Sequence, residues 1–209
     1  MKRTCGKTLT LTILAAILAG TVPAFAGDVI GQQVTVDKDR TESRLCGGYT
    51  TSGNASGNTL FVTGSASITS DEGAGGGYAE NGEAIGNQVI FSSSGSHQIE
   101  VVFGGAGTKA SENQVSITSG TVRGAQFIAG GYGDDVVDNQ VSISGGKLEN
   151  NMVMVGGYGS NRAQGNVVSV DEKADVPVLG LAGGYALKAE SNQVSIGQDA
   201  SVTAIAVGG

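Results

Sequence analysis

The sequence is poor in the residues that build reactive sites. Its 209 residues include no tryptophan, two prolines, two cysteines and one histidine. The histidine, His97, stands in the polar run SSSGSHQ, which favours neither a histidine-based metal site nor a catalytic triad. We therefore expect His97 to lie in a solvated loop.

Disulfide bonds are also excluded from most of the chain. Cys5 lies in a basic N-terminal segment, and Cys46 is the only cysteine that follows it. One thiol cannot form an internal bridge, so stability must come from packing and hydrogen bonds. Cys46 comes just before a Gly-Gly pair, where later copies of the pattern have mostly small or apolar residues, and we expect it to pack as a small apolar side chain in a strand.

The first 26 residues have the pattern of a secretory signal peptide. Lys2, Arg3 and Lys7 form a basic segment, the stretch 9–20 (LTLTILAAILAG) is apolar, and 24–26 (AFA) is a small-x-small cleavage site. The apolar stretch is shorter than the ~20 residues needed to span a bilayer. The sequence therefore predicts export followed by cleavage.

Basic residues are scarce in the remainder. After residue 26 the chain carries nine basic and 19 acidic side chains, a net charge of −10. Binding to nucleic acid depends on neutralising phosphates, and a polybasic hold on anionic lipid needs clustered Lys and Arg. The composition therefore argues against nucleic acid and against anionic membrane surfaces as partners.

What the chain has in abundance is glycine, placed periodically. Thirty-six glycines are present, and Gly-Gly pairs begin at 47, 76, 104, 130, 156, 183 and 208, which are 25–29 residues apart. The clearest unit is 129–144 (AGGYGDDVVDNQVSIS), in which we interpret Gly-Gly-Tyr as a turn followed by a polar variable segment and a short strand. Near-constant spacing of this kind indicates a repeat array.

Each repeat contains an asparagine followed by alternating apolar residues, as in NQVSI from Asn113 and from Asn139. Alternation with period two predicts a half-buried strand, and we interpret each unit as three short strands and three turns. The predicted fold is all-β, a right-handed parallel β-helix of about six to seven coils over residues 46–209, with 27–45 as a polar capping coil. Its predicted interior includes Val115, Ile117, Val141, Ile143, Val194 and Ile196.

Stacking coils would align two columns of identical side chains. The asparagines are predicted to form a structural ladder, because an amide can donate to one neighbour and accept from the other; they are Asn58, Asn87, Asn113, Asn139, Asn166 and Asn192. The tyrosines form a second column with a gap at Ala106, for which we favour structural stacking over stacking on a sugar; they are Tyr49, Tyr78, Tyr132, Tyr158 and Tyr185.

Two patterns suggest chemistry, and neither is supported by repetition. Glu112 and Asp138 precede the ladder asparagine in neighbouring copies, as a carboxylate pair of a glycosidase on a β-helix would. Residues 130–137 (GGYGDDVV) match a calcium-binding repeat once. We interpret the carboxylates as solvated surface charges and expect no catalytic residues, cofactor or metal. A carbohydrate-active lyase or hydrolase and a calcium-binding repeat protein stay as alternatives.

The Gly-Gly-Tyr units, the N-x-V-x-I strands and the signal peptide together resemble the passenger repeats of bacterial autotransporter proteins and related surface adhesins. The resemblance covers 46–209. It implies a β-solenoid displayed outside a Gram-negative cell by an outer-membrane barrel, which would lie downstream of Gly209.

The expected function is that of a non-enzymatic passenger or adhesin fragment. Its loops would attach to a host or neighbouring cell through a surface protein or a glycan. Because the last unit stops at AIAVGG without a polar coil to cover it, we expect the array to be truncated at the C-terminus.

Overall fold

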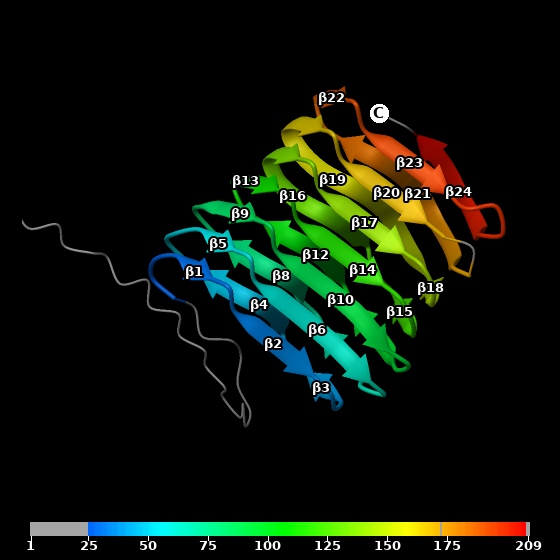
Figure 1. Ribbon diagram of the computed structural model, residues 1–209, viewed down its shortest axis with the longest axis horizontal. Helices are drawn as coiled ribbons and strands as arrows, with labels where there is room; N and C mark the ends of the chain where they lie inside the picture. The colour runs from blue at the N-terminus through cyan, green and yellow to red at the C-terminus, as the bar shows by residue number, and fades with distance from the viewer. Residues whose placement is uncertain (1–24, 172, 208–209) are drawn as a thin grey trace, which may run out of the picture.

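The computed structural model describes residues 25–171 and 173–207, which form a β-solenoid of about seven coils. Each coil stacks on the previous one in chain order, from the blue first coil to the red last coil (Figure 1). Strands pair in parallel with their counterparts in the next coil, and the described residues contain no helix. The predicted all-β parallel solenoid is confirmed. The predicted signal peptide lies almost wholly outside the described residues.

Four strand positions recur around the coil, because strands at equivalent positions pair along the axis. The first position is occupied by β1 (Val29–Ile30), β5 (Ala55–Ser56), β9 (Glu83–Ile85), β13 (Lys109–Ser111), the ends of β16 (Phe127–Val137) and β19 (Asn151–Gln164), and β22 (Lys188–Glu190). The second is occupied by β2 (Gln33–Val36), β6 (Thr59–Gly64), β10 (Gln88–Ser93), β14 (Gln114–Ile117), β17 (Gln140–Ile143), β20 (Val167–Val170) and β23 (Gln193–Ile196), which form a seven-stranded sheet.

The other two positions complete the larger, 17-stranded sheet together with the first. The third is occupied by β3 (Arg40–Thr41), β7 (Ile68–Ser70), β11 (Ser96–Ile99), β15 (Thr121–Arg123), β18 (Lys147–Glu149) and the beginnings of β21 (Asp175–Tyr185) and β24 (Ser201–Val207). The fourth is occupied by β4 (Arg44–Thr50), β8 (Gly73–Ala79), β12 (Val101–Ala106) and the Gly-Gly parts of β16, β19 and β21, with β24 following.

The expectation of three strands per unit is wrong, because the polar variable segment also forms a strand, at the first position. Its outward residues are mostly polar and differ between coils, and one small apolar residue points inward in most coils. These inward residues include Ala55, Ala84, Ala110, Val136 and Ala163, all at most 1% exposed. A single small apolar residue in a short strand gives a weak alternation signal, which explains the miss.

The main core lies between the seven-stranded sheet and the third and fourth positions. Val115, Ile117, Val141 and Ile143 have no exposed surface, as predicted. Val194 is only partly buried against the core. The prediction is wrong for Ile196, which is 45% exposed because β23 is the last strand of its sheet and is flanked on one side only.

The first coil, predicted as a polar cap over residues 27–45, has no buried residue in its stretch 37–44. Its strands β1, β2 and β3 pair in register with β5, β6 and β7. Val34 and Val36 are buried in it at 7% and 0% exposure. Phe25 forms an isolated parallel bridge with Thr50.

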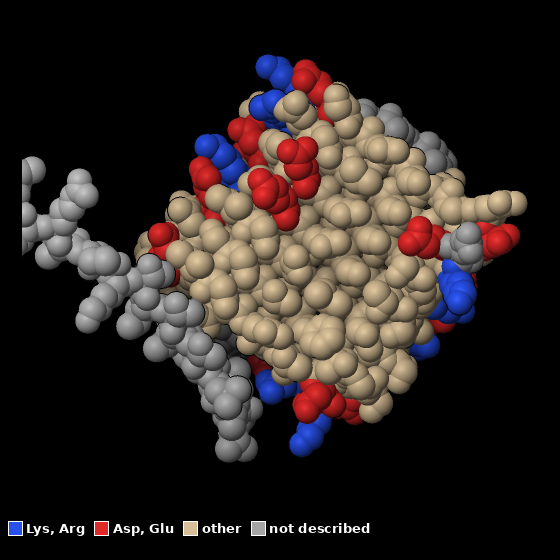
Figure 2. Space-filling model, in the orientation of Figure 1, with Lys and Arg blue, Asp and Glu red and all other residues tan. Residues whose placement is uncertain are grey.

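Charge is unevenly distributed over the surface. None of the strands of the seven-stranded sheet contains a charged residue, and its outward positions are mostly Gln, Thr and Ser. Figure 2 shows a face with an uncharged middle and with acidic and basic side chains at its margins. Ion pairs between coils lie at these margins, as in Lys109–Glu83 at 3.1 Å and Arg123–Glu149 at 2.9 Å. In the described ranges no helix has the length and apolar character that crossing a membrane requires.

Candidate functional site

The six asparagines form a continuous ladder inside the solenoid. The Nδ2 of each donates to the Oδ1 of the next at 2.9–3.0 Å, from Asn58 to Asn192. The same Oδ1 also accepts from the backbone N–H of the preceding asparagine, as Asn139 does from Asn113 at 3.0 Å. The other Nδ2 proton goes to a backbone carbonyl, as from Asn139 to Ala110. These amides are therefore occupied with each other.

The six Gly-Gly pairs that begin at 47, 76, 104, 130, 156 and 183 lie within strands at the fourth position, so their interpretation as turns is wrong. A Cβ on Gly131 would lie 2.4 Å from Cγ of Asn139, and a Cβ on Gly130 would lie 2.6 Å from the backbone nitrogen of Gln140. The same close approach recurs at the other pairs. The glycines thus let the fourth strand contact the ladder and the second strand directly, which only a residue without a side chain permits.

Glu112 and Asp138 do occupy equivalent places in successive coils. Each precedes a ladder asparagine with a positive φ, 58° and 55°, where other coils have Gly57, Gly86 or Gly165. Both side chains are exposed on the turn. What Glu112 and Asp138 share is therefore the left-handed backbone conformation of the turn.

The single match to a calcium repeat lies in β16. The Oδ1 of Asp134 accepts a hydrogen bond from Ser160 at 2.7 Å, and the Oδ1 of Asp135 accepts one from Asn161 at 2.8 Å. Both contacts are made to the next coil. Over the described ranges, the His, Cys, Asp and Glu side chains form no group of three that could hold a metal ion.

His97 lies in β11 and has no exposed surface, so the expected solvated loop is wrong. Pairing of β11 with its neighbours puts it in the inward column with Val122, and its ring lies 5.0 Å from that of Phe91. Neither ring nitrogen has a hydrogen-bond partner in the described structure. Burial lowers the pKa of His97 from 6.5 to about 4.

Cys46 is a buried free thiol, 1% exposed, on the side of β4 that faces away from the main core. It packs in a small outer cluster with Phe103 and Ala106. Burial raises the pKa of the thiol from 9.0 to about 12. Such a thiol stays protonated at neutral pH, and it packs as a small apolar group.

The tyrosines line the outer surface of the fourth strands, and we call Tyr49, Tyr78, Tyr132, Tyr158 and Tyr185 the tyrosine face. Ring centroids of neighbours lie 5.4 Å apart for Tyr49–Tyr78, 5.6 Å for Tyr132–Tyr158 and 5.1 Å for Tyr158–Tyr185, with interplanar angles of 9–18°. Tyr132 and Tyr185 are 49% and 59% exposed. The rings therefore stabilise adjacent coils and also present an aromatic surface to solvent.

Charged groups flank the N-terminal end of this face. The guanidinium carbon of Arg44 lies 5.3 Å from the ring centroid of Tyr49 and 4.9 Å from that of Tyr78. The hydroxyl of Tyr49 donates a hydrogen bond to Glu80, and this bond is the main reason why the pKa of Tyr49 is raised.

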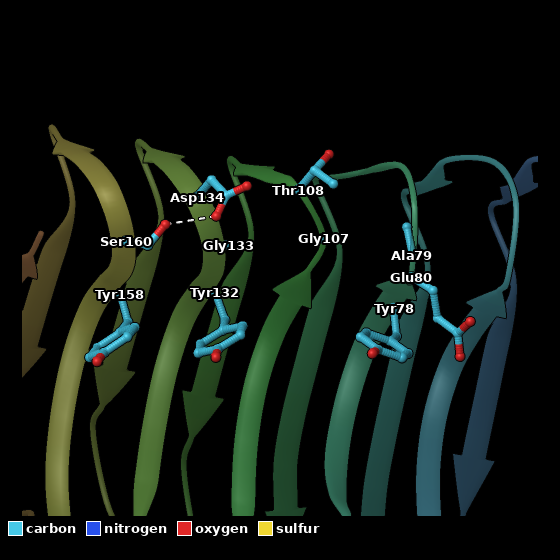
Figure 3. A pocket seen from close by; sticks show the side chains of 10 residues that line it. All are labelled: Tyr78, Ala79, Glu80, Gly107, Thr108, Tyr132, Gly133, Asp134, Tyr158 and Ser160. Atoms are coloured by element: carbon cyan, nitrogen blue, oxygen red, sulfur yellow. Dashed lines mark hydrogen bonds between the residues drawn. The ribbon is translucent and has the colours of Figure 1, made fainter.

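The tyrosine face is interrupted in the third coil, where Ala106 pairs with Tyr78 on one side and Tyr132 on the other. A hollow of about 280 Å³ lies next to this gap, whereas Ala106 itself is buried at 3% exposure and does not line the hollow. Figure 3 shows Tyr78 and Tyr132 separated by the third coil, which contributes Gly107 and Thr108 to the hollow, with Asp134 and Ser160 on the two coils that follow. The gap is visible in the sequence, but the hollow is not, because residues of four successive coils form it.

Comparison with known proteins adds no relative. No family model, curated protein or solved structure matches the chain.

Proposed function

We propose that this protein is a non-enzymatic attachment protein, in which a rigid solenoid presents the tyrosine face to a surface protein or glycan of a host or neighbouring cell. The exposed tyrosine column is the observation that carries the proposal. Contiguous exposed aromatic surface is uncommon on monomeric proteins and typical of binding surfaces, where tyrosine is enriched.

The interior suits a rigid spacer. The asparagine ladder and the Gly-Gly contacts tie every coil to its neighbour and tie the two sheets together. Rigid presentation lowers the entropy lost on binding, because the contact surface is ordered beforehand. Such a scaffold favours attachment at several rings at once.

The same proposal holds that the protein catalyses no reaction. Glu112 and Asp138 are the strongest carboxylate pair that the repeat offers, and both are exposed on turns. Catalytic acids and bases are typically found in clefts where burial and neighbouring charge perturb their acidity. Two exposed residues with positive φ fit a role in the turn better than acid-base chemistry.

The cellular address is proposed from the N-terminal sequence and from the resemblance to autotransporter passengers. We place the protein outside a Gram-negative cell, exported through its signal peptide and held at the surface by a downstream outer-membrane barrel. Treating intact cells with protease while following the chain by antibody tests this address. Full protection from protease on intact cells would contradict it.

Attachment is tested with beads coated with the full chain and counted on epithelial cell layers and bacterial lawns. Replacing Tyr132, Tyr158 and Tyr185 by serine should reduce bead retention several-fold. Gln114, Gln140 and Gln193, on the outward side of the seven-stranded sheet, provide a matched triple replacement by serine that should leave retention unchanged. Equal retention by both variants would refute attachment through the tyrosine face.

Catalysis is tested separately by incubating the chain with a glycan panel and measuring new reducing or unsaturated ends. We expect no product above the level of a heat-treated sample. Product that disappears in Glu112→Gln or Asp138→Asn would establish the carbohydrate-active alternative.

A further inference from the structure

The hollow beside the tyrosine face is long for its volume. It holds about 280 Å³, and its lining residues come from four successive coils. Coils spaced by ~4.8 Å give such a hollow a length of roughly 14 Å. Figure 3 shows Gly107 and Gly133 along its middle, with the ring of Tyr132 on one side and Asp134 on the other. Because a pocket for a whole small molecule typically has ~300–1,000 Å³, the hollow is a shallow trough that suits a short section of an extended chain.

Negative charge lines the hollow without a cation to balance it. The described residues that line it include Glu80 and Asp134 and no Lys or Arg. No ion pair in the described ranges includes either carboxylate, whereas the neighbouring Glu83 is paired with Lys109 at 3.1 Å. Like charges repel, so a ligand that carries sulfate, phosphate or carboxylate groups is disfavoured in the hollow.

Both carboxylates already accept hydrogen bonds from hydroxyl groups. The Oδ1 of Asp134 accepts one from Ser160 at 2.7 Å, and the Oε1 of Glu80 accepts one from the hydroxyl of Tyr49. An ionised carboxylate offers about four acceptor sites on its two oxygens. The second oxygen of each carboxylate can therefore accept a further hydroxyl group from a ligand.

The tyrosines contribute the edges of their rings. Tyr132 and Tyr158 are stacked with centroids 5.6 Å apart and planes at 9°, so their faces lie against each other. Tyr132 is nevertheless 49% exposed. The edge of an aromatic ring carries partial positive charge, which attracts oxygen atoms. Stacking between coils and contact with an oxygen-rich ligand are therefore compatible.

We propose that the hollow beside the tyrosine face binds a section of an unbranched glycan that carries no acidic groups. The proposal rests on the attachment function above and specifies the partner as a neutral glycan. Such a chain offers hydroxyl donors to Glu80 and Asp134 and oxygen atoms to the ring edges. Its sugar units are about as long as the ~4.8 Å coil spacing, so successive units would meet successive coils. A protein partner would instead cover a broad surface, typically about 800 Å² on each side.

The proposal is tested with beads coated with the full chain on a panel of immobilised linear oligosaccharides of glucose, galactose, mannose and N-acetylglucosamine. The sulfated form of each oligosaccharide is the matched control, because it keeps the sugar and adds negative charge. At least one neutral form should retain the beads, and its sulfated form should retain several-fold fewer. Added salt should reduce this difference, because it screens the repulsion. Retention on none of the neutral forms, or equal or greater retention on the sulfated forms, would overturn the proposal.

Variants locate the site. Asp134→Asn should reduce retention on the neutral form several-fold, because hydrogen bonds to a charged acceptor are the stronger ones. Asp138→Asn changes an exposed carboxylate outside the lining and should leave retention unchanged. Ser160→Tyr obstructs the trough and should abolish retention, whereas Asn161→Tyr adds the same side chain outside the lining and should not. An unchanged unfolding midpoint in urea shows that each variant is folded. Retention that survives Ser160→Tyr, or equal losses in Asp134→Asn and Asp138→Asn, would contradict binding in the hollow.

The two proposals fail separately on the epithelial cell layers and bacterial lawns. Periodate cleaves the vicinal diols of surface sugars, whereas protease removes surface proteins. Retention that depends on the tyrosine face, survives periodate and is lost after protease would overturn the neutral glycan and leave attachment standing. Retention on the neutral panel without retention on any cell would do the reverse.

Discussion

The solenoid contains two columns of identical side chains, one inside and one outside, and they tolerate exceptions differently. The asparagine ladder is continuous from Asn58 to Asn192, because each amide supplies hydrogen bonds that its neighbours cannot obtain elsewhere. The tyrosine face has a gap at Ala106, yet the backbone register continues through that coil.

The difference follows from solvent. A missing amide inside would leave buried donors and acceptors without partners, and each such group would cost about 1–3 kcal/mol of stability. A missing ring outside removes stacking of about 0.5–1.5 kcal/mol per pair and exposes its neighbours to water. An exposed column can therefore lose a member, whereas a buried polar column cannot.

Breaking the ladder should give the largest effect. Asn139→Ala would remove the partner of three groups: the backbone N–H of Asn113, one side-chain amide proton of Asn113, and the carbonyl of Ala110. We expect the free energy of unfolding to fall by about 4 kcal/mol, measured by urea denaturation. Asn161→Ala, an exposed asparagine nearby, should change it by about 0.5 kcal/mol or less. Similar losses in the two variants would contradict a structural ladder.

Filling the close contact between Gly131 and the ladder should cause the second largest loss of stability. In Gly131→Ala the new Cβ would lie 2.4 Å from Cγ of Asn139, which is held by hydrogen bonds and cannot retreat. We expect a loss of about 3 kcal/mol from overpacking, measured in the same way. The control is Gly180→Ala, where the new Cβ meets only Val153 side-chain atoms, the nearest at 3.7 Å, and stability should hold or rise slightly. A tolerated Gly131→Ala would show that the two strands can separate.

The comparison extends to the apolar core, where His97 is a buried polar side chain without hydrogen-bond partners in the described structure. Its pKa falls from 6.5 in the free side chain to about 4 in the fold, so the unfolded chain binds a proton in that pH range that the folded chain does not. Stability should therefore be fully present above about pH 6.5 and be lost as the pH falls towards 4, by up to about 3 kcal/mol.

The measurement is the difference in unfolding free energy between His97→Leu and the unchanged protein from pH 7 to pH 4, which cancels the titration of carboxylates. Leucine matches Leu148, the residue that follows Val122 in the same column. The advantage of the leucine variant should grow as the pH falls. A difference that stays flat would mean that His97 becomes protonated without disturbing the fold.

The tyrosine face should give the smallest loss. Tyr158→Ala removes stacking on Tyr132 and Tyr185, and we expect a loss of about 1 kcal/mol because the rings are partly exposed. Leu187→Ala serves as the control, since Leu187 is 88% exposed and should contribute nothing measurable. A loss as large as that in Asn139→Ala would place the tyrosines in the structural frame instead of on a binding surface.

The sequence was sufficient for features that repeat within one strand. Val141 and Ile143 alternate with polar residues, so the core face followed from periodicity alone. The ladder was predictable because an amide both donates and accepts. The four-strand coil was missed, since the inward residue of the first strand is a single alanine in most coils.

Other features depend on contacts between strands and could not be obtained from local pattern. The Gly-Gly pairs resemble turn residues until the fold brings Asn139 against Gly131. His97 lies in a polar run, and only the pairing of β11 with β15 places it inward beside Val122. The hollow next to the gap in the tyrosine face is likewise formed by residues of four coils.

The ladder also gives the solenoid an electrical direction. Every side-chain amide donates towards the C-terminal coil, so their dipoles add along the axis as peptide dipoles do in a helix. The end at Asn192 is the positive pole and the end at Asn58 the negative pole. Two such solenoids can therefore continue one another only head to tail, and a group that meets the Asn192 pole should be an acceptor or an anion.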